Sequence, residues 1–121
     1  MITKSHPTFG NGKICYLEIP ANDVQLSASF YEKIFNWKIR NDTDGNFSFD
    51  DAVGEVSGMW VLGRKPSTDT GIMISIMVDS IADTVKLIAA NGGQLIQETS
   101  AVTALFADPA GNMMCLYESR H

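Results

Sequence analysis

Side chains that could bind or react with a ligand alternate along residues 113–118, MMCLYE. Met113, Cys115 and Tyr117 are spaced two apart, so in a strand they share one face, and the residues between them are apolar. A thioether, a thiol and a phenol offer polarizable packing and a few hydrogen-bonding groups. We therefore expect this face to line a small-molecule pocket. The alternative is that two sheets pack directly and methionine fills the gap between them.

A catalytic role for Cys115 would require a thiolate, which a neighbouring base or a helix N-terminus must stabilise. The two histidines, His6 and His121, lie near the chain ends and are not placed to act as that base. Both cysteines, Cys15 and Cys115, occur in apolar segments, and two cysteines do not make a disulfide framework. We assign no catalytic residue, and we expect the thiols to be reduced.

The same alternation occurs in residues 14–20, ICYLEIP, where Tyr16 and Glu18 share a face. A carboxylate that faces a dry core without a partner is costly, so Glu18 favours a pocket over a packed interior. With Tyr16 beside it, Glu18 could serve as a general base in a metal-free proton transfer if the pocket raises its pKa. It could also anchor a ligand or face solvent at the pocket rim.

A third segment, residues 72–78, IMISIMV, places Met73, Ser75 and Met77 on one face and aliphatic residues on the other. The aliphatic faces of these segments should carry helices, and the mixed faces should look into the pocket. Trp60 could stack on a flat ligand or pack in the core, and its direction stays open. The expected ligand-binding residues are Tyr16, Glu18, Trp60, Met73, Ser75, Met77, Met113, Cys115 and Tyr117.

A duplicated unit positions these segments. In each half a strand is followed by a helix cap, a helix and three further strands, which gives the order βαβββ twice. The expected caps, Asn22-Asp23 and Asp79-Ser80, are 57 positions apart, and Tyr16 and Met73 have the same separation. The first helix should end at Asn36. The polar segment RKPSTDT, residues 64–70, reads as a linker between the halves.

Composition excludes several functions. The chain has 121 residues, 45% hydrophobic and 19% charged, which is typical of one globular domain. Its net charge of −5 argues against nucleic acids and anionic membrane surfaces, which need basic patches. No segment approaches the roughly 18 apolar residues that span a membrane. The N-terminal sequence MITKSHPTFGNGK lacks the apolar stretch of a secretory signal, so we expect a cytoplasmic protein.

Two segments resemble the vicinal oxygen chelate superfamily, which includes glyoxalases, bleomycin resistance proteins and extradiol dioxygenases. They are ICYLEIPANDVQLSASFYEKIFNWKI at residues 14–39 and ALFADPAGNMMCLYE at residues 104–118. Residues 76–95, IMVDSIADTVKLIAANGGQL, resemble the second strand–helix unit of the family. The resemblance covers about residues 13 to 118. It implies an α+β fold of two βαβββ modules, whose curled mixed sheet forms an open barrel around a central cavity with helices outside.

The resemblance also indicates where a metal would bind. In metal-dependent members the ligands lie on the first strand of each module and on the last strand, which correspond here to Tyr16, Met73 and Cys115. A fourth position falls near residues 59–61, which contain no His, Asp or Glu. The metals of this family prefer imidazole and carboxylate ligands. We therefore expect no metal and no cofactor.

The sequence thus favours a metal-independent small-molecule-binding protein of this superfamily. Residues 1–121 would form one domain, with module 1 at about 13–63, a linker at 64–70 and module 2 at about 71–119. One alternative is a lyase, an isomerase or another enzyme of the superfamily, metal-free or with unrecognised ligands. A further alternative is a degenerate regulatory or partner-binding module, which predicts a filled cavity. The resemblance implies a homodimer.

Overall fold

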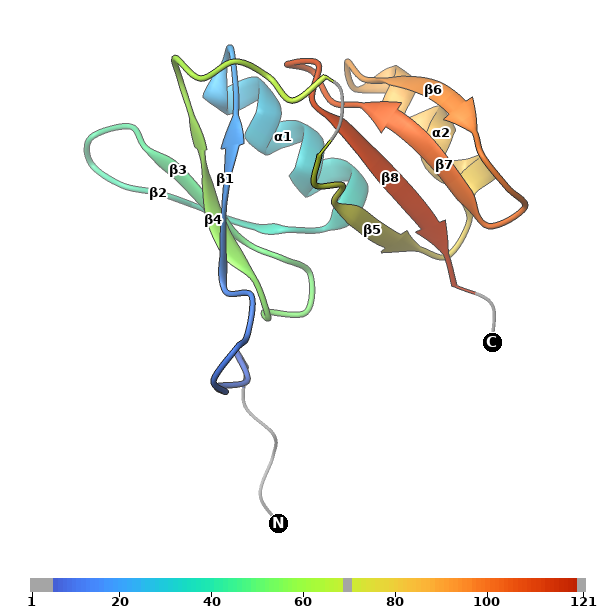
Figure 1. The fold of residues 1–121 in the computed structure, drawn as a ribbon. Helices are drawn as coiled ribbons and strands as arrows, with labels where there is room; N and C mark the ends of the chain where they lie inside the picture. The colour runs from blue at the N-terminus through green and yellow to red at the C-terminus, as the bar shows by residue number, and fades with distance from the viewer. Residues whose placement is uncertain (1–5, 69–70, 120–121) are drawn as a thin grey trace.

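The computed structural model describes residues 6–68 and 71–119. Residues 69 and 70, at the end of the expected linker, and His121 lie outside this described part. Within it the order βαβββ occurs twice along the chain (Figure 1). The elements are β1 (Tyr16–Pro20), α1 (Val24–Phe35), β2 (Lys38–Asn41), β3 (Phe47–Asp50), β4 (Ser57–Val61), β5 (Ser75–Val78), α2 (Ile81–Ala90), β6 (Gln94–Glu98), β7 (Thr103–Ala107) and β8 (Met113–Glu118).

Each module forms its own four-stranded sheet. The strand order is β1-β4-β3-β2 in the first sheet and β5-β8-β7-β6 in the second. The first strand of each module pairs in parallel with the last one, and the remaining pairs are antiparallel. Among the described residues the two sheets share no strand pairing. The α+β class with two βαβββ modules is therefore confirmed, in the form of two separate open sheets.

Both helices begin directly after the expected capping pairs, Asn22-Asp23 and Asp79-Ser80. Asp23 caps α1 by accepting a hydrogen bond from the Leu26 N–H at 3.1 Å, and Ser80 caps α2 by accepting one from the Asp83 N–H at 3.1 Å. The two capping residues are 57 positions apart, the separation expected from the repeat. Asn36 ends α1 in the left-handed conformation, with φ of 60°, as predicted. Neither helix of the described residues is long and apolar enough to cross a membrane.

The aromatic core is centred on α1, which packs between the two sheets. Phe30 of α1 stacks on Phe106 of β7, with ring centroids 6.3 Å apart. Tyr31 of the same helix stacks on Trp37 at 4.5 Å and lies 5.8 Å from Trp60 of β4. One helix therefore contacts the inner faces of both sheets, and α2 packs against β6 and β8 of the second sheet.

The turn between β7 and β8 joins the two modules through a buried polar network. The Asp108 side chain, 3% exposed, accepts hydrogen bonds from the Tyr31 hydroxyl at 2.8 Å and from the Asn112 amide group at 2.9 Å. The same Asn112 amide donates to the Pro20 carbonyl at the end of β1, and its oxygen accepts from the Ser67 N–H. Buried polar groups require hydrogen-bond partners, and here the partners come from the first module and the linker. We call Asp108 and Asn112 the clamp residues, because their side chains hold the turn, the first module and the linker together.

Candidate functional site

Each sheet has an open face, defined here as the face that points away from α1. Along β8 the inner residues Met114 and Leu116 are buried, whereas Tyr117 on the open face is 42% exposed. Ser75 lies opposite Cys115 and Met77 lies opposite Tyr117 in the parallel pair of β5 and β8. The structure thus places most of the expected ligand-binding residues on open faces: Tyr16 and Glu18 on the first sheet, and Ser75, Met77, Met113, Cys115 and Tyr117 on the second.

The central cavity that the resemblance implied is not enclosed within one chain. The inner faces of both sheets contact α1, so their open faces point outward, away from the middle of the molecule (Figure 1). Tyr16 is 51% exposed and Met77 is 66% exposed, as expected for surfaces that nothing covers. Met73 lies outside β5, because this strand is shorter than the predicted segment 72–78. Its side chain is 39% exposed.

Trp60 differs from the other expected ligand-binding residues. Its side chain is 2% exposed and lies on the inner face of β4, where it contacts the rings of Tyr31, Trp37 and Phe49. The prediction that Trp60 contacts a ligand is therefore corrected: the residue belongs to the core. The reason is register, since Gly58 and Trp60 alternate with the open-face residue Met59.

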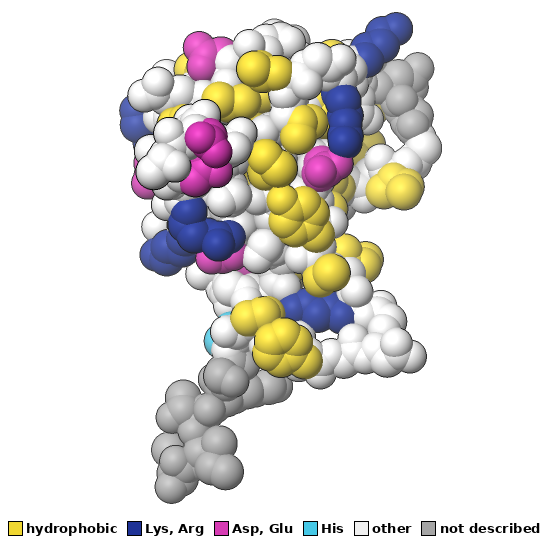
Figure 2. Space-filling view, turned by 90° about the vertical axis from the view of Figure 1, so that its left-hand side faces the viewer, with side chains coloured by type: hydrophobic (Ala, Val, Ile, Leu, Met, Phe, Trp, Pro, Cys, Tyr) yellow, Lys and Arg dark blue, Asp and Glu magenta, His cyan; other side chains and the backbone are white. Residues whose placement is uncertain are grey.

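Ion pairs lie on the open face of the first sheet. Glu18 pairs with Arg64, which follows β4, and Arg40 of β2 pairs with Asp50 of β3 at 3.0 Å. Asp50 also accepts a hydrogen bond from the Ser57 hydroxyl at 2.7 Å. Figure 2 views this side of the molecule, where hydrophobic side chains lie among acidic and basic ones. Glu18 therefore has a cationic partner, which sequence reasoning missed because Arg64 was assigned only to the linker.

The residues at the family's metal positions do not fit a hard or borderline metal ion. Tyr16 belongs to the first sheet, whereas Met73 and Cys115 belong to the second module, so one chain does not gather them on a single sheet. Their phenol, thioether and thiol groups are poor ligands for such ions. Among the described residues no three His, Cys, Asp or Glu side chains come together in a group that could hold a metal ion.

A separate cleft of about 740 Å³ lies between the modules. Its walls are the C-terminal end of α1, residues 51–56 after β3, the edge strand β5 and the part of α2 up to Leu87. Ser75 and Met77 border it, because an edge strand can contribute to both the cleft and the open face. The other expected ligand-binding residues do not line this cleft, so sequence reasoning did not anticipate it.

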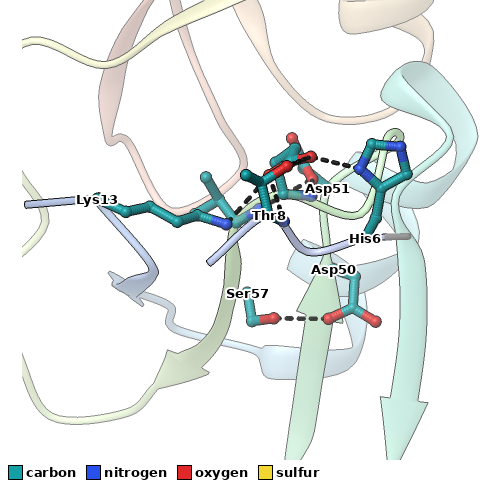
Figure 3. A network of polar contacts seen from close by, with 8 residues as sticks. His6, Thr8, Lys13, Asp50, Asp51 and Ser57 are labelled. Atoms are coloured by element: carbon teal, nitrogen blue, oxygen red, sulfur yellow. Dashed lines mark hydrogen bonds and ion pairs between the residues drawn. The ribbon is translucent and has the colours of Figure 1, made fainter. Parts of the chain in front are cut away.

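The loop at residues 51–56 is attached to the N-terminal segment through Glu55. Its carboxylate accepts hydrogen bonds from the Thr8 N–H at 3.1 Å and from Lys13 at 3.1 Å, and it contacts the His6 ring. Figure 3 shows His6, Thr8 and Lys13 gathered around this loop. The Thr8 N–H, followed by His6 and Lys13, lowers the pKa of Glu55 to about 2. A single carboxylate therefore holds the start of the described chain against one wall of the cleft.

Comparisons with known proteins agree with this architecture. The sequence matches the family described as Glyoxalase/Bleomycin resistance protein/Dioxygenase superfamily over residues 13–116. A glyoxylase-like domain-containing protein from Didymella fabae is 28% identical over 96 residues, which cover 73% of this chain and 74% of that protein.

Solved structures share the fold at low sequence identity. A glyoxalase/bleomycin resistance protein/dioxygenase family enzyme from Burkholderia phytofirmans PsJN has a TM-score of 0.72 at 15% identity, covering 88% of this chain and 98% of that one. The fosfomycin resistance protein FosX from Listeria monocytogenes has a TM-score of 0.73 at 17% identity, covering 90% and 92%. A mutant of FosX, with a TM-score of 0.72, 16% identity and 93% coverage of both chains, was solved with Mn(II) and a dihydroxypropylphosphonic acid.

At such identities the structural likeness supports the fold alone, and the family match supplies the assignment. The match spans both modules, from before β1 to within β8, and includes the clamp residues Asp108 and Asn112. The sequence match over residues 13–116, together with the two βαβββ modules of the structure, shows that this chain belongs to the glyoxalase/bleomycin resistance protein/dioxygenase superfamily.

Proposed function

We propose that this protein binds a small organic molecule on the open faces of its sheets and that it does so without a metal ion. The observation that carries the proposal is the row of side chains on β5 and β8 in which exposed Met77 lies opposite exposed Tyr117, and exposed Ser75 lies opposite half-buried Cys115. Large apolar side chains gathered on an exposed surface are a common sign of a binding site. The serine, the thiol and the phenol can orient a ligand by hydrogen bonds.

Metal independence rests on side-chain chemistry. The superfamily contains proteins that hold metals, as the Mn(II) complex of the FosX mutant illustrates. Here the corresponding positions carry Tyr16, Met73 and Cys115, none of which suits a Mn²⁺-like ion. No step of a metal-assisted reaction is therefore assigned to this chain.

The same proposal includes a homodimer. Among the strands of the described residues, β1 and β5 each pair with one neighbour, so both present a free edge beside an exposed open face. Pairing the first sheet of one copy with the second sheet of another would cover these edges and would bring Tyr16 and Glu18 toward Cys115 and Tyr117. Burial of the apolar side chains would favour this pairing. The free thiols Cys15 and Cys115 suit a reducing compartment, and we place the protein in the cytoplasm.

Metal analysis tests the central claim. The protein would be purified without chelator, exposed in turn to Zn, Ni, Mn and Fe, desalted and analysed by mass spectrometry. We expect far less than one metal ion per chain in a folded sample. Near-stoichiometric metal would contradict the proposal and would favour the lyase or isomerase alternative, because those reactions use a cation to polarise substrate oxygens.

Ligand binding would be tested in the same samples by thermal shift with a library of small aromatic and polar compounds. A ligand at about 100 times its Kd stabilises the folded protein by roughly 2.7 kcal/mol, which is readily measured. Tyr117→Ala should abolish the stabilisation by any hit. Leu26→Ala removes an equally exposed apolar side chain from α1, outside the open faces, and should leave it unchanged. Equal loss in both variants would contradict an open-face site.

A further inference from the structure

The cleft between the modules shares Ser75 and Met77 of β5 with the open face, and its other walls are formed by different residues. Its walls include inner-face residues such as Leu17, Phe49 and Ile76. Figure 1 shows the bounding elements: the segment between β3 and β4, the end of α1, and β5 with α2. Its volume of about 740 Å³ lies within the range of roughly 300–1,000 Å³ usual for small-molecule sites.

Several apolar side chains that line the cleft remain exposed to solvent. Val53 is 64% exposed, Met77 is 66% exposed and Leu87 is 45% exposed. Deeper in, the walls are formed by buried or half-buried groups, including Phe35, Trp37 and Ile76. Covering apolar surface stabilises a complex by about 25 cal/mol per Å², so an apolar ligand body would be favoured here.

Charge in the cleft has one sign. Its described lining contains three carboxylates, Asp51, Asp79 and Asp83, and no Lys, Arg or His side chain. The C-terminal end of α1 contributes a partial negative charge of roughly one half and the N-terminal end of α2 a similar positive one. These two contributions oppose each other. The carboxylates therefore set the potential, which is negative.

We propose that this cleft is a ligand site for a small amphipathic cation, such as an aromatic ring joined by a short chain to an amine. The apolar walls would hold the ring, and the amine would lie among Asp79, Asp83 and the second carboxylate oxygen of Asp51. The first oxygen of Asp51 accepts hydrogen bonds from the Glu55 and Val56 N–H groups, so it already holds the loop in place. The site is additional to the open-face site proposed above.

A matched series of probes tests this assignment: 4-phenylbutylamine, 4-phenylbutanol and 4-phenylbutyrate. They share an apolar body and differ in the charge of one end group. Amide chemical shifts of the ¹⁵N-labelled full chain would be followed during titration. We expect saturable shifts at Val53, Ile76 and Leu87 with the amine, an affinity at least about threefold lower for the alcohol, and lower still for the carboxylate.

Two double variants supply the electrostatic control. Asp79→Asn with Asp83→Asn removes two charges from the cleft, and Glu32→Gln with Asp44→Asn removes two exposed charges elsewhere. The first pair should weaken the amine about fivefold and leave the alcohol unchanged, whereas the second pair should change neither. Leu87→Ala should weaken amine and alcohol in parallel. Amide spectra that match those of the parent protein away from the substituted positions would verify that each variant is folded.

Several results would overturn the proposal. Equal affinity for amine and alcohol would remove the role of the carboxylates. Shifts centred on Met59, Cys115 and Tyr117 would assign the amine to the open faces instead. Absence of any response at Val53 and Leu87, together with a dimer in sedimentation, would assign the cleft to a second copy of the chain. Loss of binding in Tyr117→Ala alone bears on the open-face proposal and leaves the cleft assignment intact.

Discussion

The carboxylate of Glu55, whose side chain is 29% exposed, accepts hydrogen bonds from residues far away in the sequence. Its pKa falls from 4.5 to about 2, chiefly through the Thr8 N–H and then through His6 and Lys13. Because the pKa in the folded state lies below that of the free side chain, ionised Glu55 stabilises the attached segment above pH 4.5, and this contribution is lost as the pH falls toward 2. We expect the amide chemical shift of Thr8 to move toward its unattached value within that pH interval, as followed by NMR.

Glu55→Gln is the control, because the amide side chain does not titrate. In that variant the Thr8 shift should already be displaced at neutral pH and should not change further on acidification. Glu32→Gln, which removes an exposed carboxylate of α1, should keep the titration of the parent protein. A midpoint at or above pH 4.5 in the parent would show that Thr8 and Glu55 are not bonded in solution.

Single-residue features differed in how far the sequence could predict them. Alternation along β8 correctly separated Cys115 and Tyr117 from the buried residues between them, because a strand has a fixed period of two. The direction of Trp60 could not be deduced, since its segment has apolar residues on both faces. The ion pair of Glu18 with Arg64 joins residues far apart in sequence, and no local pattern encodes such a contact.

Among the secondary-structure elements, the pairing of β1 with β4 depends on Gly58. A Cβ atom at this position would lie 2.2 Å from the Leu17 carbonyl oxygen and 2.4 Å from a ring carbon of Phe49. The backbone of β1 cannot move away from an added methyl group without breaking its hydrogen bonds to β4. We expect Gly58→Ala to lower the free energy of unfolding by about 3 kcal/mol, measured by urea denaturation.

Gly10→Ala is the matched comparison, because a Cβ atom there meets nothing within 4 Å. Its effect on the free energy of unfolding should stay within about 0.5 kcal/mol. If both alanine variants unfolded at the same urea concentration, the close approach of β1 to β4 would not exist in solution.

Element boundaries show what local signals determine. The expected capping pairs located the start of both helices, because Asp23 and Ser80 occur where an extended strand gives way to helical spacing. β5 was predicted to begin at residue 72, yet only Ser75–Val78 form the strand. The apolar pattern continues through Ile72 and Met73, but a strand is defined by its partner, and partners are not visible in a single segment.

For the molecule as a whole, the hydroxyl of Tyr31 is a critical link between modules. It donates to Asp108 at 2.8 Å, and burial, followed by the charge of Asp108, raises the pKa of Tyr31 well above its usual value, so it stays protonated as a donor. Tyr31→Phe would leave a buried carboxylate short of one donor. We expect the free energy of unfolding to fall by about 2 kcal/mol in chemical denaturation.

Tyr117→Phe removes the same hydroxyl group from an exposed position and should change the free energy of unfolding by less than about 0.5 kcal/mol. Comparable effects of the two substitutions would argue against a special role for the link between Tyr31 and Asp108.

The repeat of βαβββ was visible in the sequence because caps, helices and turns recur at a constant separation, and the family match agrees with it. The outward direction of the open faces was not predictable in this way. It follows from α1 of the first module packing against β7 of the second through Phe30 and Phe106, and hydrophobic periodicity says which face is buried without saying against what.

The position of α1 between both sheets also bears on how such a chain can evolve. If each half of a duplicated protein packed only against itself, recombination could replace either half by that of a related protein with little loss of stability. Here Phe30 and Phe35 of the first half contact Phe106 of the second, so a recombined half would inherit a surface shaped for a different helix. We therefore expect substitutions at Phe30 or Phe35 to require compensating ones at Phe106.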